Sequence, residues 1–383
     1  MAALPEAFGL YIHWPFCQAK CPYCDFNSHV ARHIDQKRWL AAYVAEIARV
    51  GALTKGRTLT SVFFGGGTPS LMDPETVDGI MAAVRAMWPL SNSIEVTLEA
   101  NPTSIEAGRF RGYQQAGVNR ISMGIQALND ADLRALGRLH TVDEGLAAFE
   151  TARDIFDRVS FDLIYARQGQ GVADWQVELE RALALGLDHL SLYQLTIEDG
   201  TAFGDRYTIG KLRGLPDEDL AADLYEVTQE VCEKAGLRAY EVSNHAKDGY
   251  ESAHNLTYWR YQDYAGIGPG AHGRLTIDGV KYATETPLAP GRWLEDVETT
   301  GSGESLRSPL STKDQWAERL LMGLRLSEGV DLDGVLLPPH DVFQNKINGL
   351  RDSGFVTFDG RTLRVTPLGR PVLNGVLRCL LDD

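Results

Sequence analysis

Three cysteines lie close together near the start of the chain. Cys17 is followed by Cys21 after three residues, and Cys24 comes after two more. Thiolates are soft ligands, and three of them on one short loop suit an iron–sulfur cluster. Three protein ligands would leave one iron of a four-iron cube free to bind a small molecule. The alternative is a structural zinc ion completed by a distant histidine or by Cys232, because three such closely spaced cysteines do not close a zinc site alone.

Two other short segments have residues that could bind a ligand. The run 65–69 (GGGTP) exposes backbone amides that no side chain covers, so a ligand can approach the backbone closely. Glu99 stands just before the Asn-Pro pair at 101–102, where a carboxylate could bind ribose hydroxyls or a cationic group. From residue type alone, the first segment would equally be a tight turn and Glu99 a solvated strand end.

These segments all follow predicted strands. Short runs of apolar, β-branched and aromatic residues alternate six times with stretches of helical spacing. Such alternation predicts a parallel sheet with right-handed crossovers, and ligand-binding residues are expected after the carboxyl ends of its strands. The predicted strands are 10–13, 61–64, 94–99, 120–126, 160–165 and 189–195. The predicted helices between them are 36–50, 74–87, 105–116, 141–156 and 174–185.

The pattern changes after residue 215. A long helix is predicted at 217–235, then an aromatic and glycine-rich stretch at 240–273, and a segment at 287–311 whose Pro, Gly, Ser and Thr content is typical of a linker. A helix at 313–326 and a hairpin around Asp359 and Gly360 predict a small winged-helix-like domain. We therefore expect a barrel with the cluster and cofactor site at 1–215, an extension at 216–290, a linker at 291–311 and a C-terminal domain at 312–383.

Composition restricts the partners. The 383-residue chain has a formal net charge of −15, which disfavours nucleic acid because phosphate backbones are also negative. No apolar run approaches the roughly 18 residues of a membrane span, and the first residues lack a basic segment followed by an apolar one. Five cysteines, three of them clustered, fit disulfides poorly and favour metal or redox chemistry in a reducing compartment. We expect a cytoplasmic protein without a membrane span.

Residues 11–26 (YIHWPFCQAKCPYCDF) resemble the signature of the radical S-adenosylmethionine (SAM) superfamily, including an aromatic residue, Tyr23, just before the third cysteine. This resemblance implies a [4Fe-4S] cluster whose open iron holds SAM, and electron transfer that cleaves SAM to a 5′-deoxyadenosyl radical. The cofactor would supply the difficult chemistry and the protein would position it. The run 65–69 is similar to the superfamily's GGE-like motif. The implied fold is α/β, a partial (β/α)6 TIM-like barrel of the radical SAM type with a C-terminal winged-helix-like domain.

Three later motifs extend the resemblance to the oxygen-independent coproporphyrinogen III dehydrogenase-like family. They are 122–126 (SMGIQ), 136–140 (LGRLH) and 161–165 (FDLIY), whereas 166–170 (ARQGQ) differs from the family's usual GLPGQ. By residue type alone, Arg138 would equally be a salt-bridge partner on a helix, Asp162 a buried hydrogen-bonding strand residue and Gln126 a strand cap. By similarity to the family, one or two SAM sites would be lined by Tyr11, Tyr23, Gly66, Gly67, Thr68, Glu99, Gln126, Arg138 and Asp162.

Two features favour the HemW-type heme-chaperone branch of this family. Phe26 stands where the dehydrogenase has a fourth cysteine, and residues 254–259 (HNLTYW) are similar to the HNxxYW motif of the chaperone branch. An imidazole can ligate heme iron, and flanking aromatic rings can cover a porphyrin face. The candidate heme residues are His254, Tyr258 and His272, with His245 as a further histidine.

The resemblance implies a heme chaperone that carries the cluster and SAM, binds heme and transfers it to client proteins. Its expected partners are heme, clients such as membrane-bound respiratory enzymes, and an electron donor, and delivery would bring it to the membrane surface. Two alternatives remain. One is a radical SAM enzyme that decarboxylates coproporphyrinogen III to protoporphyrinogen IX, and the other is a radical enzyme with an unknown substrate.

Overall fold

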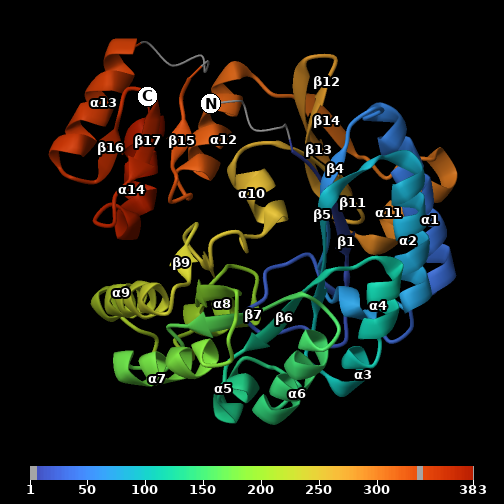
Figure 1. Ribbon diagram of the computed structural model, residues 1–383, viewed down its shortest axis with the longest axis horizontal. Coiled ribbons are helices and arrows are strands. Elements are labelled where there is room, and N and C mark those ends of the chain that lie inside the picture. The colour runs from blue at the N-terminus through green and yellow to red at the C-terminus, as the bar shows by residue number, and fades with distance from the viewer. Residues whose placement is uncertain (1–6, 334–339, 383) are drawn as a thin grey trace.

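A 12-stranded sheet forms the frame of the molecule, with the strand order β14-β13-β12-β11-β1-β4-β5-β6-β7-β8-β10-β9 (Figure 1). The computed structural model describes residues 7–333 and 340–382. Six neighbouring strands in this order pair in parallel and form the predicted partial barrel. They are β1 (Phe8–Trp14), β4 (Leu59–Gly66), β5 (Leu90–Ala100), β6 (Arg120–Gln126), β7 (Arg158–Tyr165) and β8 (His189–Gln194). All six predicted strands are confirmed.

Helices connect the parallel strands. Helix α2 (Pro74–Met87) has the predicted bounds, and a proline in its first turn is pre-set for a helix start. The predicted helix at 105–116 is divided into α3 (Ser104–Ala107) and α4 (Phe110–Ala116). The break follows Ala107, and the buried carboxylate of the preceding residue, Glu106, accepts hydrogen bonds from the Ser70 hydroxyl and the Asn101 amide. The other connections contain α1 (Gln36–Leu53), η1 (Pro69–Leu71), α5 (Asp130–Ala135), α6 (Val142–Arg153) and α7 (Val172–Leu183), and α8 (Ala202–Thr208) follows the last of these strands.

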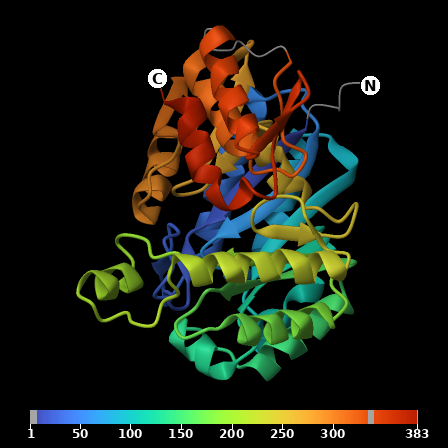
Figure 2. The same cartoon turned by 90° about the vertical axis from the view of Figure 1, so that its left-hand side faces the viewer.

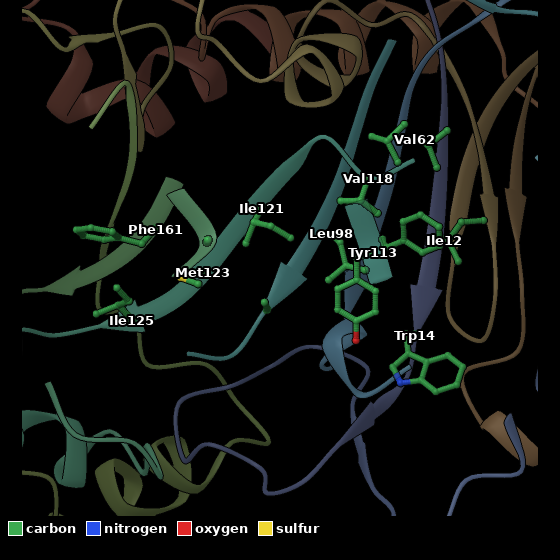
Figure 3. Close-up of a cluster of buried hydrophobic side chains, with 14 of the residues drawn as sticks. Ile12, Trp14, Val62, Leu98, Tyr113, Val118, Ile121, Met123, Ile125 and Phe161 are labelled. Atoms are coloured by element: carbon green, nitrogen blue, oxygen red, sulfur yellow. The ribbon is translucent and has the colours of Figure 1, made fainter. Parts of the chain in front are cut away.

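The pleat of each strand separates an apolar face from a polar one. Leu10, Ile12 and Trp14 of β1 are fully buried in the apolar core (Figure 3). Side chains alternate along a strand, so Tyr11 and His13 point to the opposite face. The strand register places Glu99 of β5 and Asp162 of β7 on that same face. The polar face of the barrel therefore carries the residues that were predicted to bind a cofactor.

Residues 218–285 extend the sheet on both sides. Strand β11 pairs in parallel with β1, from Phe8↔Asp263 to Ile12↔Ile267. Helix α10, which contains the HNLTYW motif, packs against β4 and β1. The elements of this region are α9 (Glu218–Lys234), β9 (Arg238–Ala239), β10 (Asn244–Ala246), α10 (Ala253–Trp259), β11 (Asp263–Ile267), β12 (His272–Ile277) and β13 (Val280–Glu285).

The segment 291–311 is not an irregular linker. It contains most of helix α11 (Pro290–Thr300) and all of β14 (Leu306–Pro309), which pairs with β13. Trp293 is fully buried, and its ring stacks on Trp39 of α1 at a centroid distance of 5.6 Å. Burial of such a large ring contributes about 2–3 kcal/mol, which offsets the weak local preference of a segment rich in Pro, Gly, Ser and Thr.

The last part of the chain has its own apolar core. Trp316, Leu320, Phe343, Leu363 and Leu377 all belong to it. Figure 2 shows this part, in orange and red, at one end of the molecule above the long helix α9. Its elements are α12 (Thr312–Gly323), β15 (Val330–Asp331), α13 (His340–Asp352), β16 (Val356–Phe358), β17 (Thr362–Val365), η2 (Arg370–Val372) and α14 (Leu373–Leu381). The predicted helix and hairpin are both present. Across residues 7–333 and 340–382, no helix is long and apolar enough to cross a membrane.

Candidate functional site

The cysteine loop begins where β1 ends. Strand β2 (Phe16–Cys17) pairs with β3 (His29–Val30), and this pairing closes the loop that carries Cys21 and Cys24. The Thr68 hydroxyl donates a hydrogen bond to the sulfur of Cys17 at 3.3 Å. The Arg138 guanidinium donates to the sulfur of Cys21 at 3.5 Å. Hydrogen bonds to the sulfur ligands are one way in which a protein adjusts the potential of an iron–sulfur cluster.

The three thiols fit a cube better than a single ion. Within the described part of the chain, no three His, Cys, Asp or Glu side chains converge as one metal ion requires. A zinc ion draws all its ligands to one point, whereas a [4Fe-4S] cube binds each cysteine through a different iron. Cys232, the suggested fourth ligand for zinc, is fully buried in α9. Three soft thiolate donors on one loop are the ligand set that a [4Fe-4S] cube with one open iron would take.

The glycine run lies against the cysteine loop. Gly66 has a φ of +111°, and a Cβ atom there would lie 2.7 Å from the His13 ring. A Cβ atom on Gly67 would lie 2.7 Å from the carbonyl oxygen of Phe16. The Gly67 and Thr68 amides donate to the Trp14 and Phe16 carbonyls at 2.7 and 2.8 Å. The absence of side chains at 66 and 67 thus allows two backbone segments to come close together at the site.

Two carboxyl groups, Glu99 and Asp162, lie on the polar face above these glycines. The Gly66 amide donates to Glu99 Oε2 at 3.2 Å. Burial, and next the charge of Asp162, raise the pKa of Glu99 to about 8. Burial raises the pKa of Asp162 to about 6, although Ser191 and Arg120 oppose the shift. A carboxyl group that titrates near neutral pH can bind a cationic ligand or a hydroxyl group, according to its charge.

Arg138 joins the strands to the cysteine loop. Its Nη2 donates to the Asn101 side chain at 2.6 Å and to the Gly124 carbonyl at 2.7 Å. The Arg138 Nε atom and the Gln126 Oε1 atom are buried and have no hydrogen-bond partner among the described residues. Gln126 also has a φ of +75°, an unusual value for a residue with a side chain. A buried donor and acceptor without partners fit a polar ligand that would satisfy both.

Two tyrosines complete the set of predicted SAM residues. The Tyr11 hydroxyl hydrogen-bonds His13 Nδ1 at 3.0 Å, and His13 Nε2 lies 2.9 Å from the Asn27 carbonyl oxygen. Tyr23 lies beside Arg138 and Cys21, and burial raises the pKa of its hydroxyl. The fold thus brings all nine predicted SAM residues to the barrel's polar face or the adjoining loops. Sequence reasoning missed His13, although it stands within the 11–26 signature.

A cavity of about 570 Å³ lies at the carboxyl ends of the barrel strands. Gly66 and Glu99 line it from the strand ends, and Phe26 lines it from the cysteine loop. The opposite part of its wall is formed by the extension and by α12, through residues such as Tyr258, His272, Arg274, Glu318 and Met322. One cavity therefore connects the predicted SAM site with the aromatic residues of the extension.

The three candidate heme residues have different environments. His254 is 1% exposed and does not line the cavity. Its Nδ1 lies 2.8 Å from the Ser61 hydroxyl and its Nε2 lies 2.6 Å from the Tyr258 hydroxyl. Burial, and next the charge of Arg120, lower the pKa of His254 to about 3. Tyr258 and His272 line the cavity, and His272 is exposed, with no hydrogen bond from its ring to the rest of the described chain.

The further histidine, His245, lies apart from the cavity on β10. It is 1% exposed, and neither ring nitrogen has a partner within the described ranges. Burial lowers its pKa to about 4. Sequence reasoning missed Arg274, Glu318 and Met322, because no local motif links β12 and α12 to the cysteine loop.

Family models and known proteins match most of the chain. Residues 11–182 match the Radical SAM superfamily, and residues 310–372 match the HemN C-terminal domain. The chain is 36% identical to the heme chaperone HemW of Escherichia coli over 100% of both chains. It is 32% identical to HemW of Bacillus subtilis, with 97% of this chain and 99% of that protein covered. It is 39% identical to the radical S-adenosyl methionine domain-containing protein 1, mitochondrial, of Bos taurus, with 98% of this chain and 87% of that protein covered.

One solved structure has the same fold over nearly the whole chain. It is the radical SAM enzyme coproporphyrinogen III oxidase (HemN) from Escherichia coli, with a TM-score of 0.83 and 22% sequence identity. The match covers 98% of this chain and 90% of that chain. At this level of identity the match establishes the fold alone.

Proposed function

This chain belongs to the family of the heme chaperone HemW within the radical SAM superfamily, and from that membership we propose that it binds heme and transfers it to client proteins. The observation that carries the proposal is the cavity shared by the strand ends and the extension. Aromatic rings cover porphyrin faces well, and Tyr258, Trp259, Tyr261 and Tyr264 all line this cavity.

His272 is the proposed ligand of the heme iron. Its ring is exposed and lines the cavity, whereas both ring nitrogens of His254 are within hydrogen-bond distance of hydroxyl groups. A neutral imidazole with a free nitrogen can bind iron directly. His254 would act on heme indirectly, because its Nε2 holds the Tyr258 hydroxyl in place at the cavity wall.

We propose that Cys17, Cys21 and Cys24 hold a [4Fe-4S] cluster and that the glycine run, Glu99 and Arg138 hold SAM. A bound cluster would supply the electron that cleaves SAM, received from an electron donor. The chain itself contributes the hydrogen bonds from Thr68 and Arg138 to the cysteine sulfurs. The proposed clients include membrane-bound respiratory enzymes, which a cytoplasmic chaperone would meet at the membrane surface.

Phe26 favours a chaperone over a porphyrinogen-decarboxylating enzyme. It replaces a fourth cysteine of the dehydrogenase pattern, its side chain is 60% exposed, and it lines the cavity. An exposed apolar ring at a cavity can contact an apolar ligand but cannot carry protons or electrons.

Heme titration of the protein with its cluster reconstituted under anaerobic conditions tests the proposal. The wild type should shift the Soret band of heme and should not convert coproporphyrinogen III when SAM and reductant are present. His272→Ala should lose the shifted band, while His33→Ala, a change of an exposed histidine outside the cavity, should keep it. Turnover of coproporphyrinogen III, or an unshifted band in the wild type, would overturn the proposal.

A further inference from the structure

The heme cavity contains one strongly basic side chain among the described residues that line it. That residue is Arg274, whereas Asp25, Glu99 and Glu318 contribute carboxyl groups. A porphyrin with propionate groups would meet an unfavourable electrostatic environment here unless Arg274 accepts a propionate. Among the described lining residues, Arg274 is therefore the side chain best suited to bind a carboxylate of the ligand.

In the structure, Arg274 binds Glu318. Arg274 comes from β12 and Glu318 from α12, so the pair links the barrel side of the cavity to the C-terminal part of the chain. The Nε atom lies 2.9 and 3.2 Å from the two carboxylate oxygens, and Nη2 lies 2.8 Å from Oε1. The two side chains are 22% and 20% exposed. This geometry is the two-pronged contact by which a guanidinium recognises any carboxylate.

Tyr261 lies beside the same carboxylate, that of Glu318. It lines the same cavity, and burial, and next the neighbouring Glu318 carboxylate, raise the pKa of its hydroxyl. Its φ of +55° belongs to the left-handed turn that ends α10, where the Tyr261 and Gln262 amides donate to the Tyr258 and Thr257 carbonyls. A carboxylate in the position of Glu318 can therefore contact both the Arg274 guanidinium and the Tyr261 hydroxyl.

We propose that Arg274 binds a carboxylate of the cavity's ligand and that Glu318 occupies this position until the ligand replaces it. The ligand class is a flat apolar ring that carries carboxylate groups, so this inference rests on the proposed function. The incoming carboxylate takes over the guanidinium contacts and accepts a hydrogen bond from the Tyr261 hydroxyl. Glu318, which is already one-fifth exposed, turns toward water.

Exchange of one carboxylate for another suits a protein that must release its ligand. The guanidinium never remains buried without a counter-ion, because Glu318 returns when the ligand leaves. Because the ligand carboxylate must displace Glu318 from Arg274, the ligand binds less tightly than it would to an arginine without a carboxylate partner. A carrier gains reversible binding from this arrangement, whereas an arginine without a competitor would retain the ligand.

The test compares hemin with its dimethyl ester, which has the same ring and iron but no free carboxylates. Soret titration of wild-type protein should show the ester binding about tenfold more weakly than the acid, the size expected for one charge-assisted contact. Arg274→Gln should bind acid and ester equally. Glu318→Gln should bind the acid about tenfold more tightly and leave the ester almost unchanged.

Arg260 and Glu328 provide the matched control. They form the same kind of two-pronged pair, at 2.7 and 2.9 Å, between α10's end and the C-terminal part, but neither lines the cavity. Arg260→Gln and Glu328→Gln should keep the wild-type ratio of acid to ester affinity. If they change it as much as the cavity variants do, the pair at Arg274 acts only by joining the two parts of the chain and the proposal fails.

The outcomes separate this inference from the proposed function. Binding of neither hemin nor its ester by the wild type would contradict the proposed function itself. Equal binding of both by the wild type would leave heme binding in place and overturn the role of Arg274. If Arg274→Gln does not fold, Glu318→Gln decides, and an unchanged affinity for the acid in that folded variant overturns the exchange.

Discussion

Glu99 determines a pH dependence of stability at the scale of a single residue. Its raised pKa of about 8 means that the folded protein holds this proton to higher pH than the unfolded chain does. Its contribution to stability is therefore complete below the ordinary pKa of 4.5 and is lost as pH rises through about 8. His254, whose pKa is lowered from 6.5 to about 3, changes stability in the opposite direction between about pH 3 and 6.5, and this change is common to the wild type and a Glu99 variant.

We predict that Glu99→Gln removes much of the loss of folding stability at high pH. Between pH 6 and pH 9, the difference in unfolding free energy between variant and wild type should grow by about 1–2 kcal/mol, a reduced figure because Glu99 also borders the cavity. Chemical denaturation of the cluster-free protein at several pH values measures it. Asp248→Asn, an exposed control, should show no such growth, and a constant difference for Glu99→Gln would contradict the assignment.

Gly66 occupies a position where a side chain would clash with the His13 ring. We predict that Gly66→Ala abolishes SAM binding to the reconstituted protein, because its Cβ atom would lie 2.7 Å from the His13 ring and displace it. The cluster should remain, since no cysteine is altered. Calorimetric titration with SAM measures the effect. Gly56→Ala is the control, because Gly56 also has a positive φ, of +85°, but its Cβ atom would meet no atom within 4 Å. Normal SAM affinity in Gly66→Ala would remove the glycine run from the SAM site.

The cysteine ligands give the third prediction at this scale. Reconstituted wild-type protein should contain about four irons per chain, and Cys21→Ser should lose the broad iron–sulfur absorbance. Cys379→Ser, which changes an exposed thiol of α14, should keep the full iron content. Iron analysis and absorbance spectra check both variants. Full absorbance in Cys21→Ser would place the cluster elsewhere.

Among the elements, α10 has a structural role that its motif did not reveal. His254 stacks on Phe63 at a centroid distance of 5.1 Å and bridges the Ser61 and Tyr258 hydroxyls. Its backbone amide donates to the buried Glu95 carboxylate at 3.1 Å. Helix α10 therefore packs on the polar face of β4 and positions Tyr258 at the cavity.

We predict that His254→Ala lowers the unfolding free energy by about 2–4 kcal/mol, from the cavity it leaves and the two hydroxyls it deprives of a partner. Denaturant unfolding of the cluster-free protein measures this. His272→Ala should stay within about 0.5 kcal/mol of wild type, because an exposed ring without hydrogen bonds is removed. The opposite order of the two variants would mean that His254 is free to bind a ligand.

The sequence pattern predicted the elements that are determined by residues close to one another in the sequence. The strands and α2 follow from apolar spacing and from a proline at the helix start, and the cysteine spacing predicts a cluster on the loop after β1. The linker prediction failed at α11 because the contact that orders it, Trp293 on Trp39, joins segments far apart in sequence. Arg274, Glu318 and Met322 could not be predicted as a set for the same reason. Only the fold brings β12 and α12 to one cavity.

At the scale of the whole molecule, a few contacts hold the C-terminal part on the barrel. The Arg325 guanidinium lies 3.0 Å from the buried carboxylate of Glu241 and 4.5 Å from the centre of the Trp259 ring. Glu241 also accepts hydrogen bonds from the Ser243 amide and the Asn244 side chain. This cluster anchors α12's end beside the aromatic part of the cavity.

We predict that Arg325→Ala destabilises the protein by about 3 kcal/mol, because the buried carboxylate of Glu241 loses its cation. Arg361→Ala, which breaks an exposed pair with Asp331, should cost about 0.5 kcal/mol or less. Thermal and denaturant unfolding compare the two. Similar small effects would show that the Arg325 contact does not hold the two parts together.

The pairing of β1 with β11 has a consequence for synthesis on the ribosome. β1 meets β4 early, but its other edge waits for residues 263–267, the last parallel partner in the sheet. At about 5–20 residues per second, that delay is on the order of ten seconds or more. Throughout that delay the part of the cavity wall that α12 forms is absent, because residues 312–323 have not yet been made. The cysteine loop is therefore made well before the segment that completes the cavity beside it.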